Sequence, residues 1–197
     1  RRLMYWQVYL HKAVLSAEFT LVEILKRAKY LVQNGTELFS TLALNEFLKK
    51  NHSLEDFNSN SGLLDTFCLL DDFDIMTSVK EWVHHKDKVL SLLCTKIIER
   101  KLLKIELQDQ PFELEYILEI QKKTEAKFNI NPNESQHLVF TDKIDNKAYN
   151  PKKDKINLLY KNETIVDIAD AADQLNISVL AKTVTKYFLC YPKESEH

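Results

Sequence analysis

The chain has 197 residues, of which 45% are hydrophobic and 28% are charged. These fractions are ordinary for a globular protein with a substantial core, arranged as one large or two small domains. A formal net charge of −2 argues against bulk nucleic-acid binding, and the apolar runs are too short to cross a bilayer. Three widely spaced cysteines and the absence of a signal-peptide pattern indicate a cytoplasmic protein with buried free thiols.

Glycine is scarce, because the chain contains only Gly35 and Gly62. This excludes a glycine-rich phosphate loop and predicts a mostly helical chain. The first predicted helix covers residues 3–33 and ends at Asn34-Gly35, a common helix stop. Its inner face is predicted from apolar residues at helical spacing, namely Val8, Leu15, Phe19, Val22 and Leu25.

Capping signals place the next helices. Thr41 fits an N-cap, so a second, short helix is expected from residue 42. The stretch NHSLEDFNSNSG is predicted to be a polar loop, with room for a single turn at LEDF. One or two helices follow, and Asp71 and Asp72 are expected to cap the second, whose inner residues are Ile75, Val79 and Trp82.

A further helix is predicted from about residue 89, with an apolar stripe and a basic end that contains Arg100, Lys101 and Lys104. We expect this helix to stop near Arg100 and the following LLKIEL to form a strand. An amphipathic, charged helix is then predicted over residues 113–127.

The composition changes after residue 130. HLVFTDKI and KINLLYK alternate as strands do, and DNKAYNPKKD is expected to join them. TIVDIADAADQL predicts a short helix capped by Thr164, and VLAKTVTKYFLCYP fits a helix or a strand, with a helix that ends in extended chain preferred. The predicted fold class is therefore mainly α with a small α+β C-terminal module, divided into residues 1–130 and 131–197.

Familiar catalytic motifs are absent from the sequence. It contains no adjacent His-Asp dyad, HExxH, P-loop, GxSxG or CxxC pair, so we predict no metal site in this chain. His84 and His85 are adjacent and would point about 100° apart on a helix, which favours a solvated surface over a shared metal. The carboxylates of Asp71, Asp72 and Asp74 are better explained by helix capping than by a bound cation.

The opening segment RRLMYWQVYLHK is unusually rich in rings and cations. On a continuous helix, Arg1, Tyr5, Tyr9 and Lys12 would share one face. Such a ridge offers a bidentate cation for phosphate, a phenol for a sugar hydroxyl and rings for stacking. The alternative is a boundary helix whose tyrosine hydroxyls simply reach water.

Three segments together resemble a known family. YLHK after an upstream arginine, LLDDFDIMTSVKEW and ERKLLKIEL are similar in order and spacing to elements of HD-domain phosphohydrolases of the deoxynucleoside triphosphate triphosphohydrolase type. The resemblance covers about residues 1–107. It implies that the chain is the multi-helical C-terminal part of such an enzyme, acting on dNTPs such as dGTP.

The resemblance also implies roles for individual residues. Arg1 would contact substrate phosphates, Tyr9 would pack against the deoxyribose, and Tyr5 would lie beside them. A second, regulatory nucleotide or anion site would contain His11, Lys12, Arg100 and Lys104. Trp6 and Gln7 stand where the family has basic residues, which departs from the pattern of that second site.

In this family a His…His-Asp…Asp set holds a divalent metal, and those ligands would precede Arg1. We therefore expect the chain to be a fragment that binds no metal or other cofactor and is inactive alone, while the whole protein uses a divalent metal. The expected partners are the nucleotide substrate and further copies of the chain, with no membrane. A non-catalytic helical interaction module is the alternative, and nucleic-acid binding through Lys152, Lys153, Lys155 and Lys161 is a weaker third hypothesis.

Overall fold

The computed structural model describes residues 8, 10–146, 156–167 and 184–195. Helices and strands follow one another in this order: α2 (Lys12–Gln33), α3 (Leu42–Lys49), α4 (Leu54–Ser59), α5 (Ser61–Cys68), α6 (Asp72–Trp82), α7 (Lys88–Ile98), β1 (Lys104–Gln108), α8 (Leu114–Phe128), α9 (Pro132–Ser135), β2 (Phe140–Asn146), β3 (Asn157–Leu159), β4 (Ile165–Asp167), β5 (Val184–Tyr191) and the 3₁₀ turn η2 (Lys193–Ser195).

The long helix α2 begins and ends at well-defined caps. His11 is extended, and its Nδ1 accepts a hydrogen bond from the Ala13 N–H at 3.2 Å, so the helix starts at Lys12 and not at residue 3 as predicted. Its predicted end at Asn34-Gly35 is confirmed. Gly35 has a φ of 83°, and the N–H of Thr36 donates to the Leu31 carbonyl in a Schellman-type closure.

The buried face of α2 is partly polar, which periodicity did not indicate. Leu15 is buried as predicted, but Val8 and Val22 are exposed. Their places on the inner face are taken by polar and charged residues, among them Ser16, Thr20, Glu23 and Arg27. The expected apolar stripe was therefore wrong in part, because hydrogen bonds and ion pairs satisfy these side chains inside the protein.

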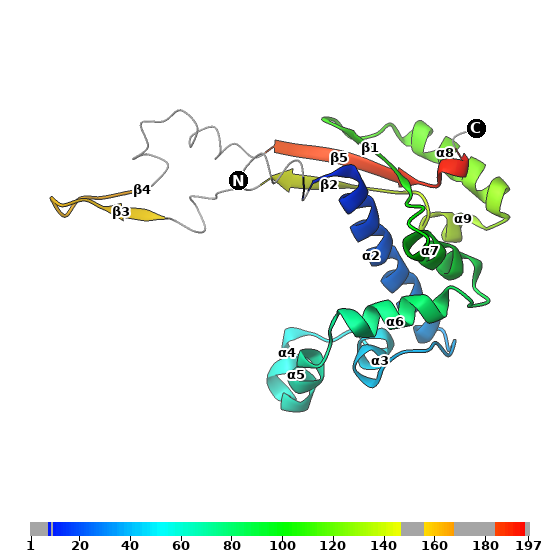
Figure 1. Ribbon diagram of the computed structural model, residues 1–197, viewed down its shortest axis with the longest axis horizontal. Coiled ribbons are helices and arrows are strands. Elements are labelled where there is room, and N and C mark those ends of the chain that lie inside the picture. Colours follow the sequence, from blue (N-terminus) through cyan, green and yellow to red (C-terminus); the bar gives the residue numbers. More distant parts are fainter. Residues whose placement is uncertain (1–7, 9, 147–155, 168–183, 196–197) are drawn as a thin grey trace.

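Helices α3 to α6 gather at the far end of α2 (Figure 1). Thr41 caps α3 and Asp71 caps α6, both as predicted. The turn allowed at LEDF is confirmed as α4, which extends to Ser59 because Ser53 and Asp56 form a capping box at its start. The helix predicted after the polar loop is α5, which begins two residues early, at Ser61. Val79 and Trp82 are buried on α6 as expected, and the Trp82 indole N–H donates to the Phe39 carbonyl at 2.9 Å.

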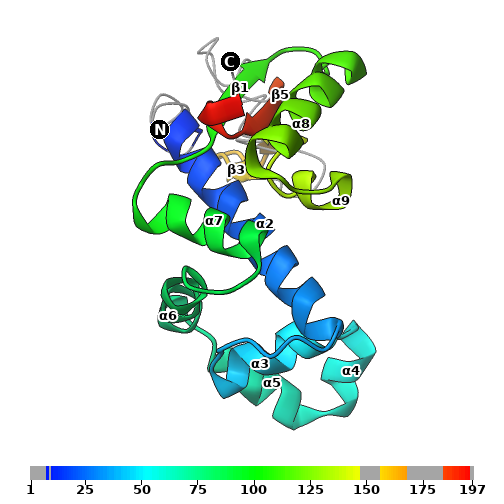
Figure 2. The same cartoon turned by 90° about the vertical axis from the view of Figure 1, so that its right-hand side faces the viewer.

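A three-stranded antiparallel sheet lies at the other end of α2, in the order β1-β5-β2. Ile105 pairs with Cys190 on one side and Phe140 pairs with the same Cys190 on the other. Alternate residues of β5 enter two cores: Phe188 and Cys190 join the main core with α2 and α7, whereas Leu189 and Tyr191 join a smaller one with α8. Helix α8 therefore covers the opposite face of the sheet (Figure 2).

HLVFTDKI and KINLLYK contain the strands β2 and β3, as predicted, whereas two other expectations for the C-terminal module were wrong. β2 pairs with β5 and not with the strand that follows it, while β3 pairs with β4 in a separate hairpin. Residues 165–167, expected to begin a helix, form β4, and the remainder of that predicted helix lies outside the described residues. Residues 184–191 form the central strand and not a helix. A partner distant in the sequence decides the pairing of β2 with β5, whereas β4 pairs with the nearby β3.

The sheet contains strands from both sides of residue 130, since β1 belongs to the first predicted domain and β2 and β5 to the second. The boundary at residues 130 and 131 stays a prediction. Cys94 and Cys190 are buried as expected, and burial raises the pKa of each thiol to about 12, but Cys68 is exposed. No helix in the described ranges is both long enough and apolar enough to cross a membrane.

Candidate anion-binding site

Four of the predicted site residues lie at one corner of the protein. His11 and Lys12 start α2, Arg100 follows α7, and Lys104 begins β1. The other three, Arg1, Tyr5 and Tyr9, fall outside the described residues. Because extended His11 separates Lys12 from the preceding residues, a continuous helical ridge from Arg1 to Lys12 is not formed.

A buried hydrogen bond joins the two predicted segments. The Ser16 hydroxyl on α2 donates to the Leu103 carbonyl at 2.7 Å, across 87 positions of sequence. Lys12 is one helical turn before Ser16, and Lys104 directly follows Leu103. The start of α2 and the connection from α7 to β1 therefore run side by side, as both ribbon views show (Figures 1 and 2).

We call this region the basic corner and define it by five residues: His11, Lys12, Arg100, Lys101 and Lys104. All are exposed except Lys104, which is half-buried. Arg100 has a φ of 57°, so the helix ends there and the helical turn that would align Arg100 with Lys104 does not persist. An anion bound by both residues would contact Arg100 just after the end of α7 and Lys104 at the start of β1. A common ligand for these residues stays a prediction.

Carboxylates partly balance this positive charge. Lys101 lies 2.8 Å from Glu99, and the hydrogen bond with Glu99 raises the pKa of Lys101. Lys104 lies 3.3 Å from Glu106 and 5.4 Å from the centroid of the Tyr191 ring. An incoming phosphate would therefore compete with nearby carboxylates, as expected for weak and salt-sensitive binding.

Tyr191 joins the corner to the end of β5. Its hydroxyl donates to the Glu106 carboxylate, and burial together with this hydrogen bond raises the pKa of Tyr191. The phenol therefore stays protonated at neutral pH and fixes Glu106, which in turn holds Lys104. Sequence periodicity gave no signal for this contact, because it depends on the pairing of β1 with β5.

A second polar cluster, missed in the sequence, lies inside the protein. The Arg27 guanidinium donates to both Asp87 carboxylate oxygens, at 3.1 and 2.6 Å, and Glu134 lies 3.4 Å away. One turn earlier on α2, Glu23 lies 2.9 Å from His137 Nδ1. This buried charge cluster joins α2 to the start of α7 and to α9. The four-residue spacing of Glu23 and Arg27 on the inner face of a helix was the available signal.

The pKa values of this cluster follow from burial and pairing. Burial alone would raise the pKa of Asp87 and of Glu23. For Asp87, hydrogen bonds from Arg27 and from the Leu90 N–H outweigh this effect, and its pKa is lowered. Hydrogen bonds from His137 and Lys26 likewise give Glu23 a net lowered pKa. Both carboxylates are therefore ionised at neutral pH. The cluster is a structural joint, since its carboxylates pair with Arg27, His137 and Lys26 across three segments of the chain.

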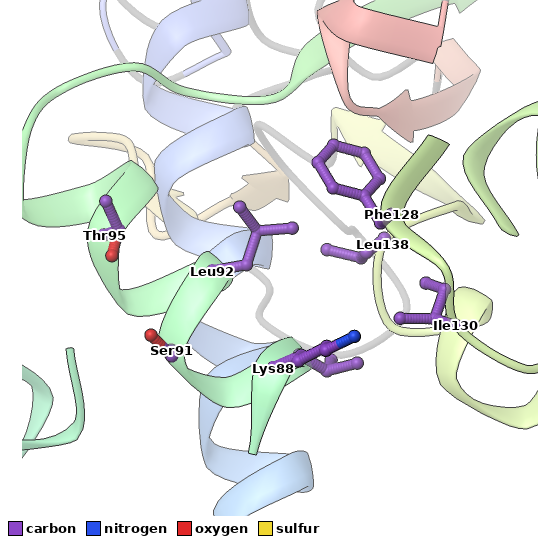
Figure 3. A pocket seen from close by; sticks show the side chains of 8 residues that line it. Lys88, Ser91, Leu92, Thr95, Phe128, Ile130 and Leu138 are labelled. Atoms are coloured by element: carbon purple, nitrogen blue, oxygen red, sulfur yellow. The ribbon is translucent and has the colours of Figure 1, made fainter. Parts of the chain in front are cut away.

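A cavity of about 310 Å³ opens between α7 and the segment that connects α8 to β2. Its walls are mainly apolar, with Leu92 on one side and Phe128, Ile130 and Leu138 on the other (Figure 3). Lys88 extends from α7 toward the Ile130 side. The size lies at the lower end for small-molecule sites. Of the predicted site residues that the structure describes, none lines it.

The acidic and histidine side chains of the described residues gather into no metal site. No three His, Cys, Asp or Glu side chains there lie close enough together to hold a metal ion. Asp71 acts as a cap, because one oxygen of its carboxylate accepts from the N–H groups of Phe73 and Asp74. His84 is exposed, and His85 Nδ1 accepts from the Asp87 N–H at 3.1 Å.

The fold has a close counterpart among solved proteins. A crystal structure of a phosphohydrolase from Bacteroides thetaiotaomicron matches it with a TM-score of 0.85 and 42% sequence identity, over 98% of this chain and 48% of that one. An uncharacterized Bacillus subtilis protein, YwfO, is 29% identical over 197 residues, which is 97% of this chain and 42% of that protein. No family model matches. The chain thus spans less than half the length of either relative.

Proposed function

We propose that this chain acts as part of a metal-dependent phosphohydrolase of the HD-domain type. The observation that supports this most strongly is its 42% identity to a phosphohydrolase over nearly its whole length. The motifs YLHK and ERKLLKIEL point to the same enzymes independently of the fold comparison. Deoxynucleoside triphosphates, dGTP in particular, are the substrates that these motifs favour.

In this proposal the chain supports the catalytic centre and does not hold it. The His-Asp dyad is missing from the sequence, and the described residues bring no metal-ligand group together. The divalent metal would be held by a part of the longer protein that corresponds to the unmatched half of the phosphohydrolase. Arg1, Tyr5 and Tyr9 would complete one wall of the substrate pocket.

The basic corner is proposed to bind nucleotide phosphate as a second site. Arg100 offers a planar, bidentate donor set, and Lys12 and Lys101 add point charges that are exposed to solvent. The Ser16–Leu103 hydrogen bond holds the two segments in a fixed relation. Because Glu99 and Glu106 compete, we expect affinity to fall steeply between 50 and 200 mM salt, on the order of tenfold or more.

Hydrolysis tests the proposed activity. The longest natural protein that contains this chain should release triphosphate from dGTP when Mn²⁺ or Mg²⁺ is added, and the 197-residue chain should not. Triphosphate release by the chain itself, abolished by chelation, would show that the division of labour is wrong. A full-length protein that is folded and metal-loaded but inert toward all nucleotides would contradict the phosphohydrolase proposal.

Binding tests the basic corner separately. We expect the Lys12→Gln/Arg100→Gln double variant of the chain to bind dGTP about tenfold more weakly, since each exposed ion pair contributes roughly 0.2 to 1 kcal/mol. The matched control is Lys122→Gln, which removes an exposed cation from α8. Calorimetry at 50 mM salt measures both. Equal affinity in the two variants would remove the corner from the proposed site.

The alternative function, a non-catalytic helical interaction module, is favoured by one observation: large apolar side chains remain exposed on α3 and α6. Self-association is also proposed, and light scattering of the purified chain would measure it. A cytoplasmic location belongs to the same proposal, and fractionation of cells that express the full protein would test it.

A further inference from the structure

Exposed apolar side chains gather where α3 and α6 begin. Leu42 is 91% exposed, Phe73 is 80% exposed and Leu69 is 72% exposed. Isolated exposed leucines are common on proteins, but a group of them beside an aromatic ring usually marks a contact surface. Together with the carboxylates of Asp71 and Asp72, these three residues define what we call the acidic–apolar surface.

Specific contacts bring these residues together. Asp74 near the start of α6 accepts a hydrogen bond from the Thr41 hydroxyl, which caps α3. Leu42 is the first residue of α3 and Phe73 is the second of α6, so each is the sequence neighbour of one partner in this bond. Leu69 lies just before the Asp71 cap. The surface is thus a junction of two helix starts, which Figure 1 shows at the end of the protein away from the sheet.

The surface is also rigid before any partner arrives. Asp71 and Asp74 form a reciprocal capping box, with the Asp71 N–H donating to Asp74 at 2.9 Å. The Trp82 indole N–H fixes the chain ahead of α3 by donating to the Phe39 carbonyl. A surface held by such contacts loses less conformational entropy on binding than a disordered one, which lowers one of the costs of association.

Charge identifies the chemistry of the partner. Between residues 37 and 82 the chain has nine acidic and three basic residues, a net charge of −6, whereas the whole chain carries −2 and the remainder therefore carries +4. The acidic residues are Glu37, Glu46, Glu55, Asp56, Asp65, Asp71, Asp72, Asp74 and Glu81. An apolar surface set in such a field selects a ligand that is apolar and positively charged.

We propose that the acidic–apolar surface docks an amphipathic helix of a partner protein that carries lysine or arginine along one side. Leucine-sized side chains of that helix pack on Leu42, Leu69 and Phe73, and its cations lie over Asp71 and Asp72. This is the helix-on-surface mode, in which apolar anchors recur every three or four residues. The interaction is independent of the phosphohydrolase activity and of the basic corner.

The test uses the 197-residue chain and a labelled 18-residue peptide with leucines on one face and lysines on the other. Fluorescence anisotropy should show saturable binding that weakens at least tenfold in the Leu42→Ser/Phe73→Ser variant. Asp72→Lys should weaken binding severalfold at 50 mM salt and make it less sensitive to salt. Thermal unfolding confirms that each variant is folded, and Leu69→Ser replaces any variant that is not.

The matched control is Leu159→Ser on the β3–β4 hairpin. Leu159 is 72% exposed, as Leu69 is, and lies outside the acidic segment of residues 37–82. Its affinity should equal that of the unaltered chain. The proposal is overturned if the control loses as much affinity, or if a peptide with glutamates in place of lysines binds equally well. It is also overturned if no saturable binding occurs, or if Phe73→Ser converts a dimer to a monomer, which would make a second copy the occupant.

Discussion

Among single residues, Arg27 is the one whose substitution we expect to destabilise the fold most. Its guanidinium is buried and makes two hydrogen bonds with Asp87, and Glu134 lies close by. Arg27→Met would keep most of the apolar stem but leave two carboxylates without their cation. We expect the free energy of unfolding to fall by about 3 to 5 kcal/mol, the usual cost of breaking a buried ion pair from one side. Urea titration measures this loss.

A second substitution separates the ion pair from simple packing. In the Arg27→Met/Asp87→Asn double variant, the orphaned charge of Asp87 is gone, although the asparagine can still cap α7. We expect the double variant to recover part of the lost stability. If both variants are equally unstable, the cost comes from packing around α2 and the charge pairing is not its source.

Single-residue expectations from the sequence succeeded where the signal was local. Thr41 and Asp71 cap helices because their short side chains reach N–H groups two or three positions ahead. Burial of Arg27 depends instead on Asp87, which lies 60 positions away. No local pattern specifies such a partner, so the basic residue was predicted only as part of a helix.

At the scale of elements, the start of α6 is sensitive to one cap. Asp71 accepts hydrogen bonds from two backbone N–H groups, whereas Asp72 carries the same charge without that role. We expect Asp71→Ala to lower the free energy of unfolding by about 1 kcal/mol, and Asp72→Ala to cost less, because it removes only an interaction with the helix dipole. Chemical denaturation of both variants gives the comparison. Equal losses would mean that charge, and not hydrogen bonding, stabilises this end.

Strands were harder to predict than helices for a physical reason. VLAKTVTKYFLCYP contains a short, dense apolar run, and a strand buried on both faces cannot be distinguished from a buried helix by periodicity. In the fold, Phe188 packs against Phe19 of α2 with ring centroids 4.2 Å apart, while Leu189 faces α8. Both neighbours come from elements more than 60 positions away, so only the assembled fold decides for a strand.

In the candidate site, too, the sequence indicated which residues matter but not how they are arranged. The sequence singled out His11, Lys12, Arg100 and Lys104, and the fold brings their two segments side by side through Ser16 and Leu103. The sequence did not predict that α2 begins at Lys12, although it did place the end of α7 near Arg100. The carboxylates Glu99 and Glu106 each lie two positions from their lysine partner, so these ion pairs are local and do not depend on how the strands pair.

For the molecule as a whole, α2 is the connecting element. Its first turns pack against β1 through Ser16, its middle carries Glu23 and Arg27, and its end meets α3. The buried charge cluster thus lies midway between the sheet and the helices α3 to α6. Loss of this joint would separate the two ends of the protein and would not act on one element alone.

This arrangement predicts unfolding in acid. The pKa values of Glu23 and Asp87 are lowered in the folded protein, so both carboxylates bind protons more readily once the chain unfolds. Their contribution to stability is complete above the unfolded pKa values, about 4.3 and 3.9, and is lost as the pH falls through the lower folded values. We therefore expect the free energy of unfolding to decline from about pH 5 downward, with near-ultraviolet and far-ultraviolet signals changing together because the joint connects both ends.

The Asp87→Asn variant tests the cause of this decline. It should be less stable than the unaltered chain at pH 7, yet lose less stability between pH 5 and pH 3, because one of the two titrating groups is gone. Glu18→Gln, which alters an exposed carboxylate on the same helix, should leave the pH profile unchanged. Parallel profiles for Asp87→Asn and the unaltered chain would place the acid sensitivity outside this cluster, for instance at Glu194. Burial would raise the pKa of Glu194, but its hydrogen bond with Lys96 outweighs that effect, and the pKa is lowered.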